Sequence, residues 1–548
     1  MNEILIKAGF GGVIRMGEAL MAATPTLLVG LLVAAILRFY FDKAGVRRVF
    51  GGSSLRSLPQ SWAIGMLLPV CSIGVLPILL EMRRAKVKPG AMSAFALSAP
   101  LFNPLSLLYG VTLSRPYVIL MFAAASLFLV TVVGWVWDRF GTADQSPQAP
   151  QGMKDTLEPT KNAAIAQTRS EPIAIIGVRR LFAMFVYASR QLVGPAGAWS
   201  LLGISGVGLL AALLPYGSLG EAMGRDDWWA PTRMVFVSVP VYATPMLAMS
   251  QLGMMFQHAN SPGAAFILLV LGAGINLGTI GWMSRQFGYR SVMIWVTCLL
   301  VIVTSIAYGV NRPLVPPGVT PSSHTHAFDI YTNPIHQWDS TSTNFALSKL
   351  SEKFGLVEQI ALSILAFLAL AGICLRLAGV DEEKLASKTQ PTRSSSSTPS
   401  ETVSLGLDRI VGPNIVGLTL IIGLVAISIV MCYAFYPSRD ECFEEIRFIR
   451  ADALSGANSG DYEHAKFWIP RWDEWSRRME VGVYLRSGRI TPYQRMQGFL
   501  LRQKLDLLEH EVEHDSPDKH AISSLVAELM ATNARWTNAY RKPYRPVR

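Results

Sequence analysis

The sequence predicts an all-α polytopic membrane protein with two inverted repeats, each containing a broken or re-entrant helix. Two extra spans and a small helical soluble C-terminal domain are expected to follow. The chain has 548 residues, of which 51% are hydrophobic and only 16% charged, and this is too apolar for a soluble protein of that length. Several runs reach the roughly 20 apolar residues that cross a bilayer. Two of these apolar segments are interrupted by proline and glycine at matching places.

The first interruption is the run LPVCSIGVLP from Leu68 to Pro77. Proline removes a backbone donor and glycine weakens a helix. In lipid, an unsatisfied backbone group is costly, so a break at membrane depth is expected only where protein or a water-lined cavity covers it. Broken helices of this kind commonly form the binding sites of transporters.

The interruption returns in the second half of the chain. The run VPVYATP, which ends at Pro245, echoes the run LPVCSIG, which ends at Gly74, and so matches Tyr242 with Cys71. The tripeptide Pro-Gly-Ala then occurs in both halves, and an asparagine follows thirteen residues after each of its glycines, at Asn103 and Asn276. Two interrupted segments at corresponding places in two halves point to a transporter site.

Charge placement predicts the topology. Basic residues flank the first interruption on both sides: Lys43, Arg47, Arg48 and Arg56 before it, and Arg83, Arg84, Lys86 and Lys88 after it. The second interruption is preceded only by Arg225 and Arg233, and no Lys or Arg lies between it and Pro262. Because basic residues favour the cytoplasmic side, we expect two hairpins that enter from opposite faces and meet near the midplane. Two complete crossings are the alternative.

The candidate substrate-binding residues are the polar and helix-breaking residues of these segments. They are Pro69, Cys71, Ser72, Gly74, Pro77, Asn103, Pro240, Tyr242, Thr244 and Asn276. An asparagine facing lipid would be costly, and its amide both donates and accepts, so it can bind a substrate or join two helices. A Cys71 thiolate can bind a soft metal or metalloid, or the residue can serve only as a small side chain at a tight break.

Six parts are expected along the chain. They are residues 1–137, the first permease repeat; 138–175, a polar linker; 176–312, the second permease repeat; 313–353, a polar loop; 354–435, two additional transmembrane helices with a Ser/Thr-rich linker; and 436–548, the soluble helical C-terminal domain. In the last part, Thr491 before Pro492 predicts a helix start. An apolar stripe is expected on that helix at Met496, Phe499, Leu500, Leu507 and Leu508.

Histidines outside the repeats suggest an alternative function. The polar loop contains His324, His326 and His336, for which a solvated loop is the simpler interpretation. The run from His510 to His514 matches the zinc-protease pattern H-E-x-x-H. Its acidic surroundings and the following proline favour a solvated helix end. A membrane-anchored zinc-binding hydrolase, or a sensor that uses the C-terminal domain, is the alternative.

The first repeat resembles a known family. The resemblance is carried by the Pro-Val-Cys-Ser-x-Gly-x-x-Pro run at 69–77, Arg83-Arg84, Pro89-Gly90-Ala91, Phe95 and the Ala-Pro-x-x-Asn-Pro run at 99–104. These residues are similar to the predicted-permease family that includes organoarsenical efflux permeases. Pro240 and Gly263-Ala264-Ala265 resemble the second repeat of that family. The resemblance covers roughly residues 5 to 310. It implies a permease, and the efflux permeases within that family suggest metalloid efflux.

The functional expectation is therefore a permease, either a secondary transporter or a channel-like protein, that moves a small solute across the inner membrane as a multi-pass protein. A metalloid or organo-metalloid is the suggested substrate. Enzyme activity, catalytic residues, a resident metal and cofactors are not expected, and no P-loop pattern is present. The expected partners are the lipid bilayer and a small molecule or ion. Nucleic acid is not expected, because loop charges explain the net charge of +11. Homo-oligomer formation is left open.

Overall fold

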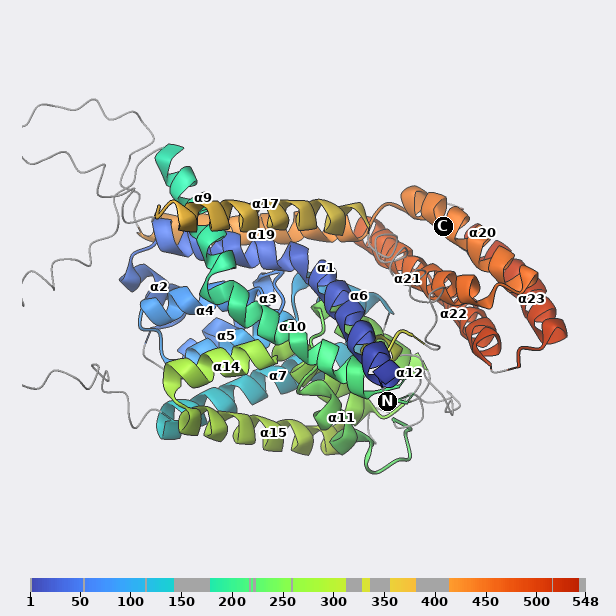
Figure 1. Cartoon of the computed structure of the whole chain (residues 1–548), viewed down its shortest axis with the longest axis horizontal. Helices are drawn as coiled ribbons and strands as arrows, with labels where there is room; N and C mark the ends of the chain where they lie inside the picture. The colour runs from blue at the N-terminus through green and yellow to red at the C-terminus, as the bar shows by residue number, and fades with distance from the viewer. Residues whose placement is uncertain are drawn as a thin grey trace, which may run out of the picture. The chain divides into compact units, whose positions relative to one another are not determined.

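A computed structural model describes residues 2–52, 55–113, 116–141, 178–215, 218–219, 223–257, 260–311, 328–335, 355–380, 413–514 and 516–541. Every regular element in these ranges is helical (Figure 1). Six of the helices described are long and apolar enough to cross a membrane. Two further pairs of helices are bent at a short break, and the number of spans rises to eight if each pair counts as one span. The chain is therefore an all-α polytopic membrane protein. By contacts it divides into two compact units, Met1–Ser106 with Leu120–Ser428, and Leu107–Ile119 with Ile429–Arg548.

The helices of the first half are α1 (Asn2–Tyr40), α2 (Lys43–Val49), α3 (Ser57–Leu67), α4 (Val75–Arg84), α5 (Pro89–Leu101), α6 (Pro104–Leu113) and α7 (Pro116–Val136), which continues into the π-helical turn η1 (Trp137–Gly141). The helices of the second half are α9 (Val178–Val193), α10 (Pro195–Leu213), α11 (Ala230–Ser238), α12 (Pro245–Gln257), α13 (Pro262–Ile267) with the π-helical η3 (Leu268–Ala273), α14 (Leu277–Phe287) and α15 (Tyr289–Asn311). The 3₁₀ turn η4 (Asp329–Tyr331), α17 (Leu356–Leu377) and α19 (Pro413–Phe435) follow.

Each half contains two breaks, where the sequence predicted one. The first half is interrupted at residues 68–74 and again at 102–103, and the second half at 239–244 and 274–276. The second break of each half bends the helix axis, by 48° between α5 and α6 and by 58° between α13–η3 and α14. Helices of about 10 residues are about 15 Å long, or half the hydrocarbon thickness of a bilayer. The breaks of α3–α4 and α11–α12 therefore lie about half a bilayer thickness from the point at which each segment begins.

Both α3–α4 and α11–α12 are re-entrant hairpins. Arg47, which precedes the first hairpin, donates to the carbonyl of Ala85, which follows it, at 3.3 Å. Ser261, after the second hairpin, donates its N–H to the carbonyl of Met223, before it, at 3.2 Å. Each segment thus returns to the end of the bundle at which it entered, which excludes two complete crossings. Figure 1 places α2 and α4 toward one end of the long helices and α11 and α12 toward the other.

The two halves are related by an approximate two-fold axis. The N–H of Gly90 donates to Asp138 at 2.7 Å, and the N–H of Gly263 donates to Asn311 at 3.1 Å, each across 48 residues. Between the halves, the Trp295 indole donates to Ser93 at 2.6 Å, and the rings of Phe122 and Phe266 lie 5.1 Å apart. Ser93 of the first half and Phe266 of the second are 173 positions apart, and so are Phe122 and Trp295. The two contacts therefore join the same pair of equivalent positions, once in each direction. Such reciprocal contacts are characteristic of two-fold symmetry.

The second unit contains α20 (Arg439–Ser459), α21 (Tyr462–Ser487), α22 (Pro492–Glu513) and α23 (Lys519–Arg541). The predicted start of α22 is confirmed, since Thr491 forms a capping box with Gln494. The predicted apolar stripe on α22 is mostly wrong. Only Leu508 lies in the core, with Leu501, Leu505 and Val512, whereas Met496, Phe499 and Leu507 are exposed and Leu500 is half-buried.

Candidate functional site

Side chains cap the helices that follow three of the four breaks, and Cys71 makes an equivalent bond in the turn that precedes α4. In every case the side chain accepts the backbone N–H three residues further on. The four bonds are Gly74 to Cys71 Sγ at 3.4 Å, Ser106 to Asn103 Oδ1 at 2.8 Å, Leu247 to Thr244 Oγ1 at 3.3 Å, and Thr279 to Asn276 Oδ1 at 2.8 Å. The first N–H groups of a helix have no partner within it, so these caps satisfy groups that would be costly in a membrane.

The caps correct the sequence alignment of the two halves. Cys71 and Thr244 differ by 173 positions, as do Asn103 and Asn276, so the four bonds form two equivalent pairs. Sequence comparison had matched Cys71 with Tyr242, two positions earlier. That match relied on the Pro-Val dipeptides. The equivalent hydrogen bonds of Cys71 and Thr244 show instead which residues of the two halves correspond. Tyr242 therefore occupies the position that Pro69 holds in the first half.

Four polar groups near the breaks are buried and make no hydrogen bond in the described part of the protein. They are Asn103 Nδ2, Asn276 Nδ2, Ser72 Oγ and Tyr242 Oη, in side chains that are at most 2% exposed. Each such group costs about 1–3 kcal/mol when it lacks a partner. Buried polar groups are usually paired with protein or with ordered water, and the described residues contain others of this kind, such as Ser238 Oγ beside the second-half break. All four can donate a hydrogen bond.

Contacts across the two halves bring these groups together. Thr279 at the start of α14 donates its hydroxyl to the carbonyl of Ser72 in the first hairpin, at 3.5 Å. Cys71 and Tyr242, from opposite hairpins, pack in one apolar cluster. A Cβ on Gly274 would lie 3.8 Å from Leu101, its equivalent in the first half. The breaks thus meet close to the two-fold axis.

Other predicted site residues lie where neighbouring helices pack closely against the breaks. A Cβ on Gly30 of α1 would lie 2.0 Å from the carbonyl oxygen of Gly74, and a Cβ on Gly206 of α10 would lie 2.0 Å from that of Pro240. Only glycine allows α1 and α10 to approach the hairpins so closely. Pro69 is buried in the first break and Pro77 in the first turn of α4. These prolines and glycines therefore shape the breaks.

Several polar residues were missed by the sequence analysis. Ser106 and Thr279 donate the capped N–H groups, and their 173-residue offset is the signal that could have revealed them. Glu81 on α4 is 7% exposed and accepts from the Tyr187 hydroxyl at 2.8 Å. Gln251 on α12 accepts from the buried Tyr331 at 2.8 Å. No periodicity in the sequence indicates that Tyr187 and Tyr331 contact the hairpins.

The histidine patterns do not form a metal site within the described residues. His510 and His514 are exposed, with ring centroids 6.2 Å apart, and α22 ends at Glu513 as predicted. No group of three His, Cys, Asp or Glu residues in the described ranges could hold a metal ion. His324, His326 and His336 lie outside the described residues.

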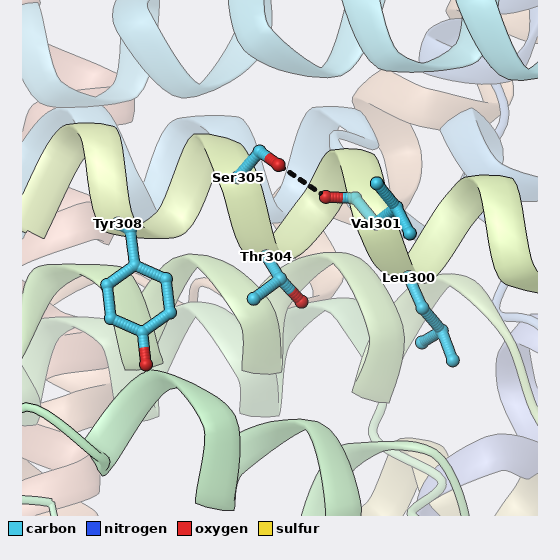
Figure 2. A pocket seen from close by; sticks show the side chains of 5 residues that line it. All are labelled: Leu300, Val301, Thr304, Ser305 and Tyr308. Atoms are coloured by element: carbon cyan, nitrogen blue, oxygen red, sulfur yellow. Dashed lines mark hydrogen bonds between the residues drawn. The ribbon is translucent and has the colours of Figure 1, made fainter.

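A depression of about 400 Å³ lies elsewhere, on one face of α15 (Figure 2). It is lined by Leu300, Val301, Thr304, Ser305 and Tyr308. Ser305 and Val301 are exposed, and the Ser305 hydroxyl donates to the carbonyl of Val301 in its own helix at 2.7 Å. The depression contains none of the predicted site residues and is not a candidate transport site.

Comparison with known proteins agrees with this geometry. A family described as predicted permease matches residues 15–311, which include all four breaks. UPF0718 protein YcgR of Bacillus subtilis (strain 168) is 27% identical over 88 residues, which are 16% of this chain. The match spans only 30% of the length of that relative. No solved structure matches the chain. Because the family covers more than half of the sequence, the chain belongs to the predicted permease family.

Proposed function

We propose that this membrane permease carries a small solute through a polar site where its two re-entrant hairpins meet. The observation that supports the site is the group of four buried, unpartnered donors on Ser72, Asn103, Tyr242 and Asn276. A solute that accepts hydrogen bonds would satisfy them in turn as it passes. The equivalent asparagines would then provide matching contacts to the two halves of the protein.

The chemistry of the site favours an oxygen-bearing solute with a soft centre. The segments after the breaks present their N-termini here, and the positive ends of helix dipoles favour electron-rich oxygen. The Cys71 thiol favours soft atoms such as a metalloid. A metalloid or organo-metalloid carrying oxygen would use both features, and we propose this class as the substrate.

The orientation follows from the basic residues. Arg83, after the first hairpin, donates to the carbonyl of Gln286 at 3.4 Å and lies over the ring of Phe287 at 4.6 Å. The basic loops of both halves thus gather at one end, which the positive-inside rule places in the cytoplasm. We propose the inner membrane as the location, with two permease repeats at 1–137 and 176–312.

Transport into proteoliposomes tests the proposal. The double substitution Asn103→Ala and Asn276→Ala removes both amide donors. The matched control is Ser305→Ala with Ser363→Ala, because these exposed hydroxyls bond only within their own helices. Uptake of a trivalent organo-metalloid should fall at least tenfold in the asparagine variant and stay unchanged in the control. Equal uptake by parent and asparagine variant would contradict the site.

A further inference from the structure

A short segment between α15 and α17 is buried within the first compact unit. Residues 328–335, which we call the strap, contain the turn η4 and lie beyond the family match at 15–311. Phe328, Tyr331 and Thr332 are at most 1% exposed, and Ile335 is 2% exposed. Connecting loops usually run over the surface, because a buried loop must find partners for its backbone groups. The burial of the strap therefore indicates a specific seat in the protein.

The strap is hydrogen-bonded to α1 and to the end of α10. The N–H of Asn333 donates to the carbonyl of Leu214, directly after α10, at 3.0 Å. Its Nδ2 donates to the carbonyl of Lys7 in α1 at 3.3 Å. Arg15 of α1 is 6% exposed and donates through Nε to the carbonyl of Thr332 at 3.0 Å. Because α1 and α10 pack against each other, the strap is seated on a helix from each half.

The strap is also bonded to the second hairpin. The Tyr331 hydroxyl donates to Gln251 Oε1 of α12 at 2.8 Å, and both side chains are buried. Gln251 lies six residues after Pro245, about 9 Å along the axis of α12 from the break that carries Thr244. The residue 173 positions earlier is Ile78, whose apolar side chain cannot make such a bond in the first hairpin. The bond between Tyr331 and Gln251, which we call the latch, thus belongs to the second hairpin.

We propose that the strap is the outer gate of the transport site and that the latch holds it shut. This inference rests on the proposed function and its orientation, which place the end of the second hairpin outside. Figure 1 places the start of α1 and α12 toward that same end. A solute that passes between the outside and the breaks must go past this end of α12. Opening therefore requires the strap to leave its seat, which breaks the latch and the bonds of Asn333 together.

The natural Cys71 thiol reports the opening without any transport assay. It is 0% exposed, so a membrane-impermeant maleimide added from outside reaches it only when a path to the breaks opens. The labelling rate is read at Cys71 by mass spectrometry, with the full-length protein in vesicles of known orientation. Tyr331→Phe and Gln251→Met each remove one partner of the latch and should raise the outside rate about threefold to tenfold. The double variant should not exceed the faster single variant by more than twofold, because both changes remove the same bond.

The side of labelling separates a gate from general loosening of the fold. In both single variants, labelling of Cys71 from the cytoplasmic side should stay within twofold of the parent. The matched control is Tyr289→Phe on α15, whose ring is 70% exposed, and it should label at the parent rate from either side. Equal acceleration from both sides in Tyr331→Phe and Gln251→Met would overturn the inference.

A disulfide tests the strap in the opposite direction. A Cβ on Gly11 of α1 would lie 2.6 Å from Asn333 Cγ. Gly11→Cys with Asn333→Cys therefore brings two thiols within disulfide reach, for which the Cβ atoms must be about 3.5–4.5 Å apart. The oxidised protein should label at Cys71 from outside at least threefold more slowly than the same protein after reduction by a phosphine.

Two results would overturn the gate. One is an outside labelling rate less than twofold above the parent in both Tyr331→Phe and Gln251→Met. The other is an oxidised disulfide variant that labels as fast as its reduced form. Neither measurement uses a solute, so each is independent of the uptake by the asparagine variants that tests the proposed function.

Discussion

Replacing the two asparagines by serine separates their capping role from substrate binding. Serine is as good a helix cap as asparagine, so Asn103→Ser and Asn276→Ser should retain the bonds to Ser106 and Thr279. The shorter hydroxyl cannot replace the Nδ2 donor in position. The serine variants should therefore fold as the parent does and still lose transport.

The length and burial of the two capping bonds set the magnitudes. Both are 2.8 Å long and buried, so alanine at either site should destabilise the protein by about 1–3 kcal/mol, and equally in the two halves. Serine should cost less than about 0.5 kcal/mol. Each lost donor should reduce solute affinity by a factor of roughly three to ten, and both together by up to about a hundredfold.

Two assays on the same preparations are needed. Thermal melting in detergent reports the cap, and solute uptake by proteoliposomes reports the donor. The reasoning predicts that the double serine variant melts like the parent but transports at least tenfold more slowly. Parent-level uptake by the double serine variant, with reduced uptake only in the alanine variant, would show that the asparagines are structural caps and nothing more.

Three further predictions concern packing, an ion pair and pH. Gly30→Ala places a Cβ 2.0 Å from the Gly74 carbonyl oxygen and should lower the melting temperature by the equivalent of about 1–3 kcal/mol, whereas Gly9→Ala, with no atom within 4 Å, should not. Arg502→Met removes the ion-pair partner of Glu480, whose side chain is only 2% exposed, and should speed hydrogen exchange in α21 and α22 by at least tenfold. The control is Glu474→Gln, which removes the ion-pair partner of Arg478. Because the Glu474 side chain is 49% exposed, this change should alter the exchange rate less than threefold. Burial, together with nearby Glu480, raises the pKa of Tyr540, so the domain should lose stability as pH rises above about 10, where tyrosine ionises in the unfolded chain. Hydrogen exchange at high pH should show a smaller loss in Tyr540→Phe, in which the raised pKa values of Tyr436 and Cys442 still contribute.

The sequence was informative about the breaks because proline, glycine and asparagine have strong local effects. The run from Leu68 to Pro77 and its echo located both hairpins, and the two ends of each hairpin lie together, as the charge pattern led us to expect. The second break of each half was missed, because the bend at Asn103 or Asn276 needs only two or three residues. Apolar composition on both sides of such a bend resembles one continuous span.

The wrong face of α22 has a clear physical reason. Its buried side includes Gln497, Gly498 and Arg502, and Arg502 enters the core to pair with Glu480 at 2.8 Å. Polar residues on the core side weaken the periodic signal that sequence analysis uses. The bond from Ser428 to the carbonyl of Leu67 was also beyond prediction, since it joins segments 361 residues apart. Sequence patterns describe local structure, whereas such pairings depend on the packed fold.

The sidedness of three exposed positions tests the central claim most directly. Single cysteines replace Arg48, Lys88 and Asp226 in a protein whose natural cysteines are alanine, and each is labelled with a membrane-impermeant maleimide from one side at a time. The account predicts that positions 48 and 88 label from the same side and position 226 from the opposite side. Labelling of positions 48 and 88 from opposite sides would show that the first broken segment crosses the membrane, and no polar site between two hairpins would remain.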